Sequence, residues 1–207
     1  MRKVIPLFAT PVFETEIFLN DETKLFIKNQ KTKTKVIEPA KNGLISNDTY
    51  ILNNKKLNKI KENILNEINF YKNNILQVKE NIQCYIKNSW LMFHNKNHFS
   101  NSHNHLNSFI SGILYIKTPE NCGNIVFHTT KVNHTLFPSI NIPFKNYNEY
   151  NSTFITFKVK ENQLLLFPSS LVHSVENNLS NDTRICLAFN VLIKGDLNNF
   201  EIDHFSL

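Results

Sequence analysis

The chain has 207 residues, of which 41% are hydrophobic and 12% are aromatic. This length and apolar content suffice for one domain with a packed core, and they exclude a disordered chain. The formal net charge is +6, but the lysines are spread along an Asn-, Ile- and Lys-rich sequence without a dense basic tract. The charge alone therefore gives little support for a nucleic-acid partner.

The cysteines give information about the compartment. Cys84, Cys122 and Cys186 are an odd set of three, widely spaced and without a CxxC pair. This argues against a disulfide framework and against a thiolate zinc site. No signal peptide opens the sequence, and no window is long and apolar enough to span a membrane. We therefore expect a cytoplasmic protein with no membrane partner.

The first part of the chain predicts one strand and supporting helices. Residues 4–18 have strand character interrupted by two prolines, as at a sheet edge. Residues 20–30 predict a short helix with Asn20 or Asp21 as its cap. Residues 53–78 predict a longer helix, because apolar side chains recur at three- and four-residue steps. These side chains are Leu57, Ile60, Ile64, Leu65, Ile68, Tyr71 and Ile75.

From residue 81 the chain changes to short segments rich in Ile, Val, Phe and Leu, separated by Asn, Pro and Gly turns. Helices followed by many short strands predict a mainly β fold, a barrel or jelly roll with flanking helices. With no repeat and no linker, we expect one domain over 1–207. Residues 1–80 would support a core over 81–207. The long polar stretch 128–152 is either a lid or a surface insertion.

Two histidines stand one residue apart in the stretch SHNHLNSFISGILYI, residues 102–116. On an extended chain, His103 and His105 point to the same side, because side chains alternate between the two faces of a strand. Such a pair is suited to holding one ion, and it needs a third partner from elsewhere in the chain.

His173 is the candidate third partner, and Arg184 follows it across a turn formed by residues 177–182. On two neighbouring antiparallel strands these two side chains would line one cavity. Three imidazoles could hold a divalent metal there, while a guanidinium binds a carboxylate. The alternative is that the histidines are incidental polar residues. The remaining histidines are expected on the surface or in loops: His94, His98, His128, His134 and His204.

Four motifs together resemble a family of iron(II)/2-oxoglutarate-dependent oxygenases of marine bacteria and their phages, related to prolyl hydroxylases. The motifs are LFATPVF (7–13), NSWLMF (88–93), HNHLNSFISGILYIKTPENCGNIVF (103–127) and QLLLFPSSLVHSVENNLSNDTRICLAFN (163–190). The resemblance covers nearly the whole chain apart from the helical 20–80 region and the 128–152 loop. It implies a double-stranded β-helix, a cupin-like jelly roll, with iron(II) in its mouth.

The resemblance also implies roles for single residues. His103 would be the first metal ligand, His173 the distal ligand, and Arg184 the partner of the far carboxylate of 2-oxoglutarate. The sequence departs from the wider pattern at His105, where related enzymes have a carboxylate.

Three readings of His105 remain open. It completes a three-histidine site, or it stays off the metal. In the third reading, it is itself the first ligand, with Asn107 following and His103 in a supporting or substrate role.

Two further residues are candidates for contact with the cosubstrate. The Tyr115 hydroxyl could bind a carboxylate of 2-oxoglutarate, or the side chain is a core tyrosine. Asn190 lies six positions after Arg184, so both face one way on a regular strand, and its amide could reach the cosubstrate.

The implied function is a dioxygenase that hydroxylates a C–H bond of its substrate while 2-oxoglutarate is decarboxylated to succinate. The substrate would be a small molecule or a protein side chain, and homodimer formation is left open. The alternatives are a cupin-type three-histidine metalloenzyme without 2-oxoglutarate and a non-catalytic jelly-roll binding module.

Overall fold

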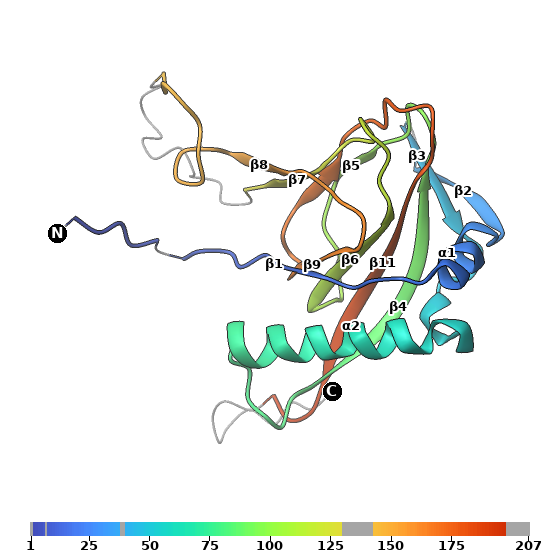
Figure 1. The fold of residues 1–207 in the computed structure, drawn as a ribbon. Coiled ribbons are helices and arrows are strands. Elements are labelled where there is room, and N and C mark those ends of the chain that lie inside the picture. The colour runs from blue at the N-terminus through green and yellow to red at the C-terminus, as the bar shows by residue number, and fades with distance from the viewer. Residues whose placement is uncertain (1, 7, 38–39, 130–142, 198–207) are drawn as a thin grey trace.

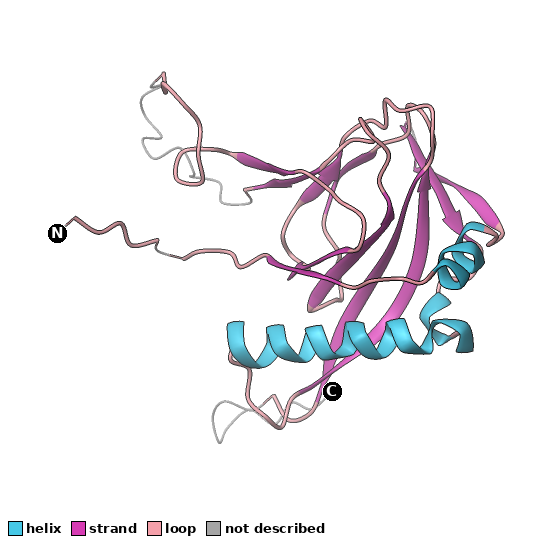
Figure 2. Ribbon diagram, viewed as in Figure 1, coloured by secondary structure: helices cyan, strands magenta, loops and turns pink. Residues whose placement is uncertain are grey.

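Two antiparallel sheets form the body of the protein (Figures 1 and 2). The computed structural model describes residues 2–6, 8–37, 40–129 and 143–197. The larger sheet has the strand order β1-β9-β6-β11-β4-β3-β2, and the smaller has the order β5-β10-β7-β8. The larger sheet holds β1 (Phe13–Glu16), β2 (Thr32–Ile37), β3 (Ala40–Ser46), β4 (Gln83–His94), β6 (Ile110–Lys117), β9 (Gln163–Pro168) and β11 (Arg184–Lys194). The smaller holds β5 (Ser100–His103), β7 (Ile125–His128), β8 (Phe154–Phe157) and β10 (His173–Val175). The predicted mainly β jelly roll with flanking helices is confirmed.

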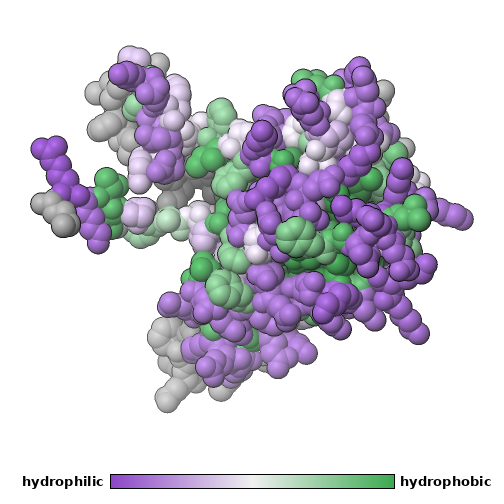
Figure 3. Space-filling model, viewed as in Figure 1, coloured by the Kyte–Doolittle hydropathy of each residue, from purple (hydrophilic) through white to green (hydrophobic). Residues whose placement is uncertain are grey.

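The helices cover the outer face of the larger sheet (Figure 1). Helix α1 (Asp21–Lys28) begins after Asn20, whose side-chain oxygen accepts a 2.9 Å hydrogen bond from the Thr23 amide. The predicted long helix is divided into the 3₁₀ turns η1 (Ile51–Asn53) and η2 (Lys55–Leu57), helix α2 (Asn58–Phe70) and the π-helical turn η3 (Tyr71–Ile75). The solvent side of this layer is mostly hydrophilic, as Figure 3 shows.

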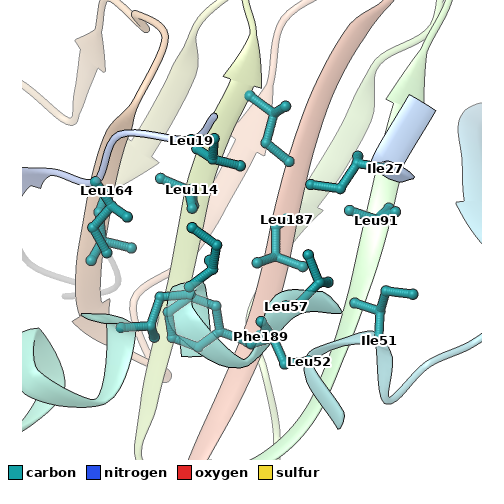
Figure 4. Packing of buried hydrophobic residues seen from close by; sticks show 14 of the residues in the cluster. Leu19, Ile27, Ile51, Leu52, Leu57, Leu91, Leu114, Leu164, Leu187 and Phe189 are labelled. Carbon is teal, nitrogen blue, oxygen red and sulfur yellow. The ribbon is translucent and has the colours of Figure 1, made fainter. Parts of the chain in front are cut away.

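The strands β4 and β11 each have two different faces. Leu91 on β4 and Leu187 and Phe189 on β11 belong to the core cluster under the helices (Figure 4). Met92 and Cys186 belong to a second cluster, between the two sheets. Because side chains alternate along a strand, one set of residues anchors the helices and the other set faces the interior of the jelly roll.

Gly112 on β6 leaves room for a ring on the helix side of the larger sheet. Its register partner on β11 is Phe189, and a Cβ at Gly112 would overlap the Phe189 ring. The position therefore needs a residue without a side chain, so that two neighbouring strands can stay paired around a buried aromatic ring.

The region 20–80 holds one element that the sequence did not predict. The hairpin β2–β3 extends the larger sheet beside β4, with Leu44 opposite Phe93 and Ile45 opposite Met92. Its first strand begins Thr-Lys-Thr-Lys, so the alternation of apolar and polar residues that marks a half-buried strand is missing. The predicted strand over 4–18 is limited to β1, an edge strand paired with β9.

The predicted lid falls largely outside the described residues, since 130–142 are not among them. The described part, 143–153, projects from the ends of β7 and β8 away from the larger sheet (Figure 1). Its Tyr147 side chain is 73% exposed. A lid role therefore stays a prediction. None of the helices in the described ranges is long and apolar enough to cross a membrane.

Candidate metal and carboxylate site

The interior faces of the two sheets line a narrow cavity of about 60 Å³. On the larger sheet, β4 and β11 pair in register, so that His94 lies opposite Arg184 and Trp90 lies opposite Ala188. All four side chains line the cavity. The volume is several times that needed for one water, so the space can hold a small acid.

Three histidines meet at this cavity, on the side of the smaller sheet. His103 ends β5 and is the register partner of His173 on β10. The candidate ligand atoms of His103, His105 and His173 all lie within 4.8 Å of one another. The predicted grouping of these three residues is therefore present. Asn107, which follows His105 in the third reading, lies exposed in the next turn, with a φ of 56°.

His105 reaches this group by a route that the sequence did not predict. Strand β5 ends at His103, so the two histidines are not on one regular strand. The His105 amide donates a 3.0 Å hydrogen bond to the Ser169 carbonyl. This bond ties the segment after β5 to the turn before β10 and brings the His105 ring within 5.3 Å of the His103 ring, measured between centroids.

Backbone carbonyls fix the tautomers of two of the rings. Nδ1 of His173 is 3.0 Å from the Leu171 carbonyl oxygen, and Nδ1 of His103 is 2.6 Å from the Asn101 carbonyl oxygen. Since a carbonyl only accepts, each Nδ1 carries the hydrogen, and each Nε2 keeps its lone pair. Metal-binding histidines are oriented by such bonds.

His173 is also held in the neutral form that binds metals. Burial of the ring lowers the pKa of His173 to about 3, and the neighbouring His103 and His105 contribute in the same direction. At neutral pH the ring therefore carries no proton on Nε2, and no proton has to leave before a cation binds.

Arg184 forms the closed end of the cavity. The side chain is 1% exposed. Its Nη1 donates to the carbonyl oxygens of Cys122 and Gly123, at 3.3 and 3.1 Å. Among the described residues, Nε has no hydrogen-bond partner, and no carboxylate forms a salt bridge with this guanidinium. A buried cation without a counterion fits an anionic ligand, which would supply the missing charge and acceptors.

Tyr115 lies beside this end of the cavity. It is the register partner of Cys186, which lines the cavity. The Tyr115 hydroxyl is buried and has no partner among the described residues. Burial raises the pKa of Tyr115 far above its ordinary value, so the hydroxyl stays a neutral donor. Together the orphaned Tyr115 hydroxyl and the Arg184 guanidinium suit one carboxylate of a dicarboxylic acid.

The predicted arrangement of strands is wrong in one respect. His173 and Arg184 lie on β10 and β11, which belong to different sheets, and not on neighbouring strands of one sheet. They nevertheless line the same cavity, because the two sheets face each other.

Asn190 lies far from the carboxylate end. Six residues of extended strand separate it from Arg184, which is a distance of roughly 20 Å. Its side-chain oxygen accepts a 3.3 Å hydrogen bond from the Ser111 hydroxyl. The two residues face the same way, as predicted, but they lie on opposite sides of the Ala188 position, which lines the cavity between them.

Two cavity residues were not identified from the sequence. His94, predicted as a surface or loop residue, is 2% exposed, and its Nε2 lies 3.2 Å from the Ser100 hydroxyl. The prediction was wrong because β4 continues to this residue, and alternation from Trp90 would have found it. Ser111 was missed because a turn between β5 and β6 interrupts the alternation that starts at His103. His98 and His128 are half-buried, and His134 and His204 lie outside the described residues.

Comparisons with known proteins agree with this geometry. Residues 88–190 match the sequence model of a family described as "Putative 2OG-Fe(II) oxygenase". The epimerase SnoN from nogalamycin biosynthesis, described as non-heme and alpha-ketoglutarate-dependent, is 8% identical, with a TM-score of 0.63 over 95% of this chain and 88% of that chain.

Two further solved structures share the fold. HygX from Streptomyces hygroscopicus, solved with nickel and 2-oxoglutarate, is 13% identical, with a TM-score of 0.58 over 88% of this chain and 82% of that one. A Pseudomonas putida prolyl-4-hydroxylase is 9% identical, with a TM-score of 0.57 over 88% and 93%. No curated protein matches the sequence.

At these identities the structural likenesses establish the fold alone. The assignment of an activity rests on the family match. The matched span contains the three histidines, Arg184 and Tyr115. The donor set of imidazoles, with a buried guanidinium that has no counterion among the described residues, fits a divalent metal and a dicarboxylic acid in one cavity. The protein is a member of the 2OG-Fe(II) oxygenases, enzymes that depend on iron(II) and 2-oxoglutarate.

Proposed function

We propose that His103, His105 and His173 hold iron(II), and that Arg184 and Tyr115 bind the far carboxylate of 2-oxoglutarate. The observation that carries this proposal is the pairing in one cavity of a three-imidazole group with a buried guanidinium for which the described part of the chain supplies no counterion. Iron(II) and 2-oxoglutarate, with dioxygen as the oxidant, would supply the chemistry: one oxygen atom would enter succinate as carbon dioxide is released, and the other would enter a C–H bond of the substrate as a hydroxyl group.

The residues of the chain would position and shield these groups. Arg184 would orient the dicarboxylic acid through charge-assisted hydrogen bonds, and Tyr115 would donate one neutral hydrogen bond beside it. The interior side chains Met92 and Cys186 are 7% and 2% exposed, so they would keep water from this end. Burial raises the pKa of the Cys186 thiol to about 11, so it stays protonated and is a poor competitor for the metal.

A neutral ligand set has an electrostatic consequence. Three imidazoles leave the double positive charge of iron(II) uncompensated by the protein, whereas a carboxylate ligand would neutralise part of it. The anionic 2-oxoglutarate would then supply the compensating charge. We therefore expect metal and cosubstrate to strengthen each other's binding, and by linkage the effect is reciprocal.

The remaining expectations concern substrate and setting. A small molecule or a protein side chain is the proposed substrate, with nucleic acid not favoured. The protein is proposed to work in the cytoplasm, and its three free cysteines are compatible with a reducing compartment. Homodimer formation stays an open expectation.

An anaerobic titration of iron(II) and then 2-oxoglutarate into metal-free protein tests the proposal. We expect the weak visible charge-transfer band of an iron–oxo-acid chelate in the wild type and in Lys194→Met. Lys194 is an exposed cation at the other end of β11. We expect no band in His173→Ala and a large loss of 2-oxoglutarate affinity in Arg184→Met.

Two other outcomes favour the alternative functions. Metal binding without this band would favour a three-histidine metalloenzyme that does not use 2-oxoglutarate. Absence of metal binding would leave a jelly-roll binding module and contradict the proposal.

A further inference from the structure

The interior face of the larger sheet is fully buried at one end and half-buried towards the other. Arg184 and His94 are 1% and 2% exposed, whereas Trp90, Asn88 and Asn190, on the same interior face of the larger sheet, are half-buried. If the proposed function holds, the dicarboxylic acid occupies the fully buried end. The substrate then approaches the histidines from the end where Asn88 and Asn190 lie.

A row of three neutral polar side chains lies here, and Ser111, which is 2% exposed, is the member of the row that lines the cavity. Asn190 is in register with Asn88 on one side and with Ser111 on the other, so the three lie side by side. The Ser111 hydroxyl lies 3.3 Å from the Asn190 side-chain oxygen and 2.8 Å from the Ser169 hydroxyl. The Asn88 side-chain oxygen is buried and has no hydrogen-bond partner among the described residues. Buried polar atoms are nearly always satisfied, so this oxygen points to a missing donor.

The row offers no charge to a ligand. None of the three side chains is ionisable, and Lys87, the next residue along β4, donates a 3.5 Å hydrogen bond to the Asn107 carbonyl at the exposed rim. An ionic group placed on the row would lose water without gaining a counterion. A neutral group that both donates and accepts would be satisfied, because a carboxamide side chain presents one acceptor and one donating NH₂ group.

Trp90 joins this row to the metal group. Its ring lies 6.0 Å from the His105 ring between centroids, at an interplanar angle of 25°. Trp90 and Asn88 are two residues apart on β4 and face the same way. A bound molecule that contacts the amides would therefore lie over the indole, beside the histidines.

We propose that Asn88, Asn190 and Ser111 form a substrate subsite for the neutral amide group of a peptide. A peptide amide has one N–H donor and one carbonyl acceptor, which complement the unpaired Asn88 oxygen and the amide hydrogens of the row. The inference rests on the proposed function and adds the chemical class of the substrate. A carbon next to the bound amide would face the three histidines across Trp90.

Trp90 makes the proposal testable without turnover, because it is the single tryptophan of the chain. The protein is loaded anaerobically with iron(II) and 2-oxoglutarate, and the charge-transfer band is recorded. N-acetylglycine N′-methylamide, a neutral diamide, is then titrated while the Trp90 fluorescence is followed. N-acetylglycine, its anionic counterpart, and methyl glucoside, a neutral polyol, are titrated in parallel.

We expect a saturable fluorescence change with the diamide and weaker binding of the other two probes. Asn88→Leu and Asn190→Leu should each weaken diamide binding about fivefold to tenfold, the effect of one lost hydrogen bond. Asn73→Leu, an exposed asparagine in η3, should leave it unchanged. The charge-transfer band must persist in each variant, which shows that the iron and 2-oxoglutarate sites are intact. If a leucine variant does not fold, the serine variant at that position replaces it, with the same expectation.

Several results would overturn the inference. One is a diamide affinity that is the same in the wild type and both asparagine variants. Another is equal or tighter binding of the anion or the polyol. A third is an intact band with no response of Trp90 to the diamide. If the band itself is absent in the wild type, the proposed function fails, and the substrate assignment fails with it.

Discussion

The protonation of His173 allows the environment of the metal group to be tested in metal-free protein. Burial and its histidine neighbours lower the pKa of His173 to about 3 in the folded chain, against 6.5 for an unperturbed imidazole. As the pH falls below 6.5, the unfolded chain takes up a proton at this position and the folded chain does not. The stabilisation is therefore present above pH 6.5 and is lost progressively towards pH 3.

The size of the effect follows from the two pKa values. Between pH 7 and pH 5, the free energy of unfolding should fall by about 2 kcal/mol because of His173. The figure depends little on the folded pKa, because pH 5 lies well above it. Urea denaturation of chelator-treated wild type and His173→Gln at both pH values measures this contribution as the difference between the two proteins.

A control separates His173 from the other titrating groups. His98→Gln removes a half-buried histidine outside the metal group, and its pH dependence is measured beside that of His173→Gln. Parallel pH dependences for the wild type and His173→Gln would refute the reasoning, since His173 would then titrate alike in the folded and unfolded chains.

Three further substitutions test other parts of the structure. At a free concentration of 100 times its Kd for the wild type, 2-oxoglutarate should raise the free energy of unfolding of the iron-loaded wild type by about 2.7 kcal/mol. The gain should disappear in Arg184→Met, and full retention in a thermal melt would contradict the assigned carboxylate site. His105→Asp should bind iron(II) without 2-oxoglutarate about tenfold more tightly by calorimetry, because a carboxylate neutralises part of the charge; unchanged affinity would place residue 105 off the metal. Gly112→Ala should lower the free energy of unfolding by about 1–3 kcal/mol. In a Phe189→Leu background the loss should shrink, and an equal loss in both backgrounds would exclude the ring overlap.

Much of the fold could be predicted because its signals are local. The helix-forming period of α2 and the cap at Asn20 are contained in short windows of sequence. The β2–β3 hairpin could not be predicted, because its stability comes from pairing with β4 and not from its own apolar pattern. Edge elements of this kind take their structure from a neighbour that is distant in the sequence.

The candidate site was predictable in its chemistry and less so in its geometry. Residue types and the resemblance to a family selected the three histidines and Arg184, and one cavity contains all four. Alternation correctly put Asn190 and Arg184 on one face, but it gives no distance along the strand. The position of His105 depends on a hydrogen bond to the Ser169 carbonyl. A local sequence pattern cannot predict a bond between residues that are so distant in the sequence.

The two faces of β11 also bear on how such an enzyme can change its substrate over evolution. Leu187 and Phe189 belong to the core beneath the helices, whereas Ala188 and Asn190 face the space between the two sheets. In a saturation library of this strand, the two kinds of position should therefore show different defects. Substitutions of Leu187 and Phe189 should lower protein abundance, whereas substitutions of Ala188 and Asn190 should change substrate choice at normal abundance. Selection can thus act on the even positions of a strand whose odd positions maintain the scaffold, and new specificities can arise with little loss of foldability.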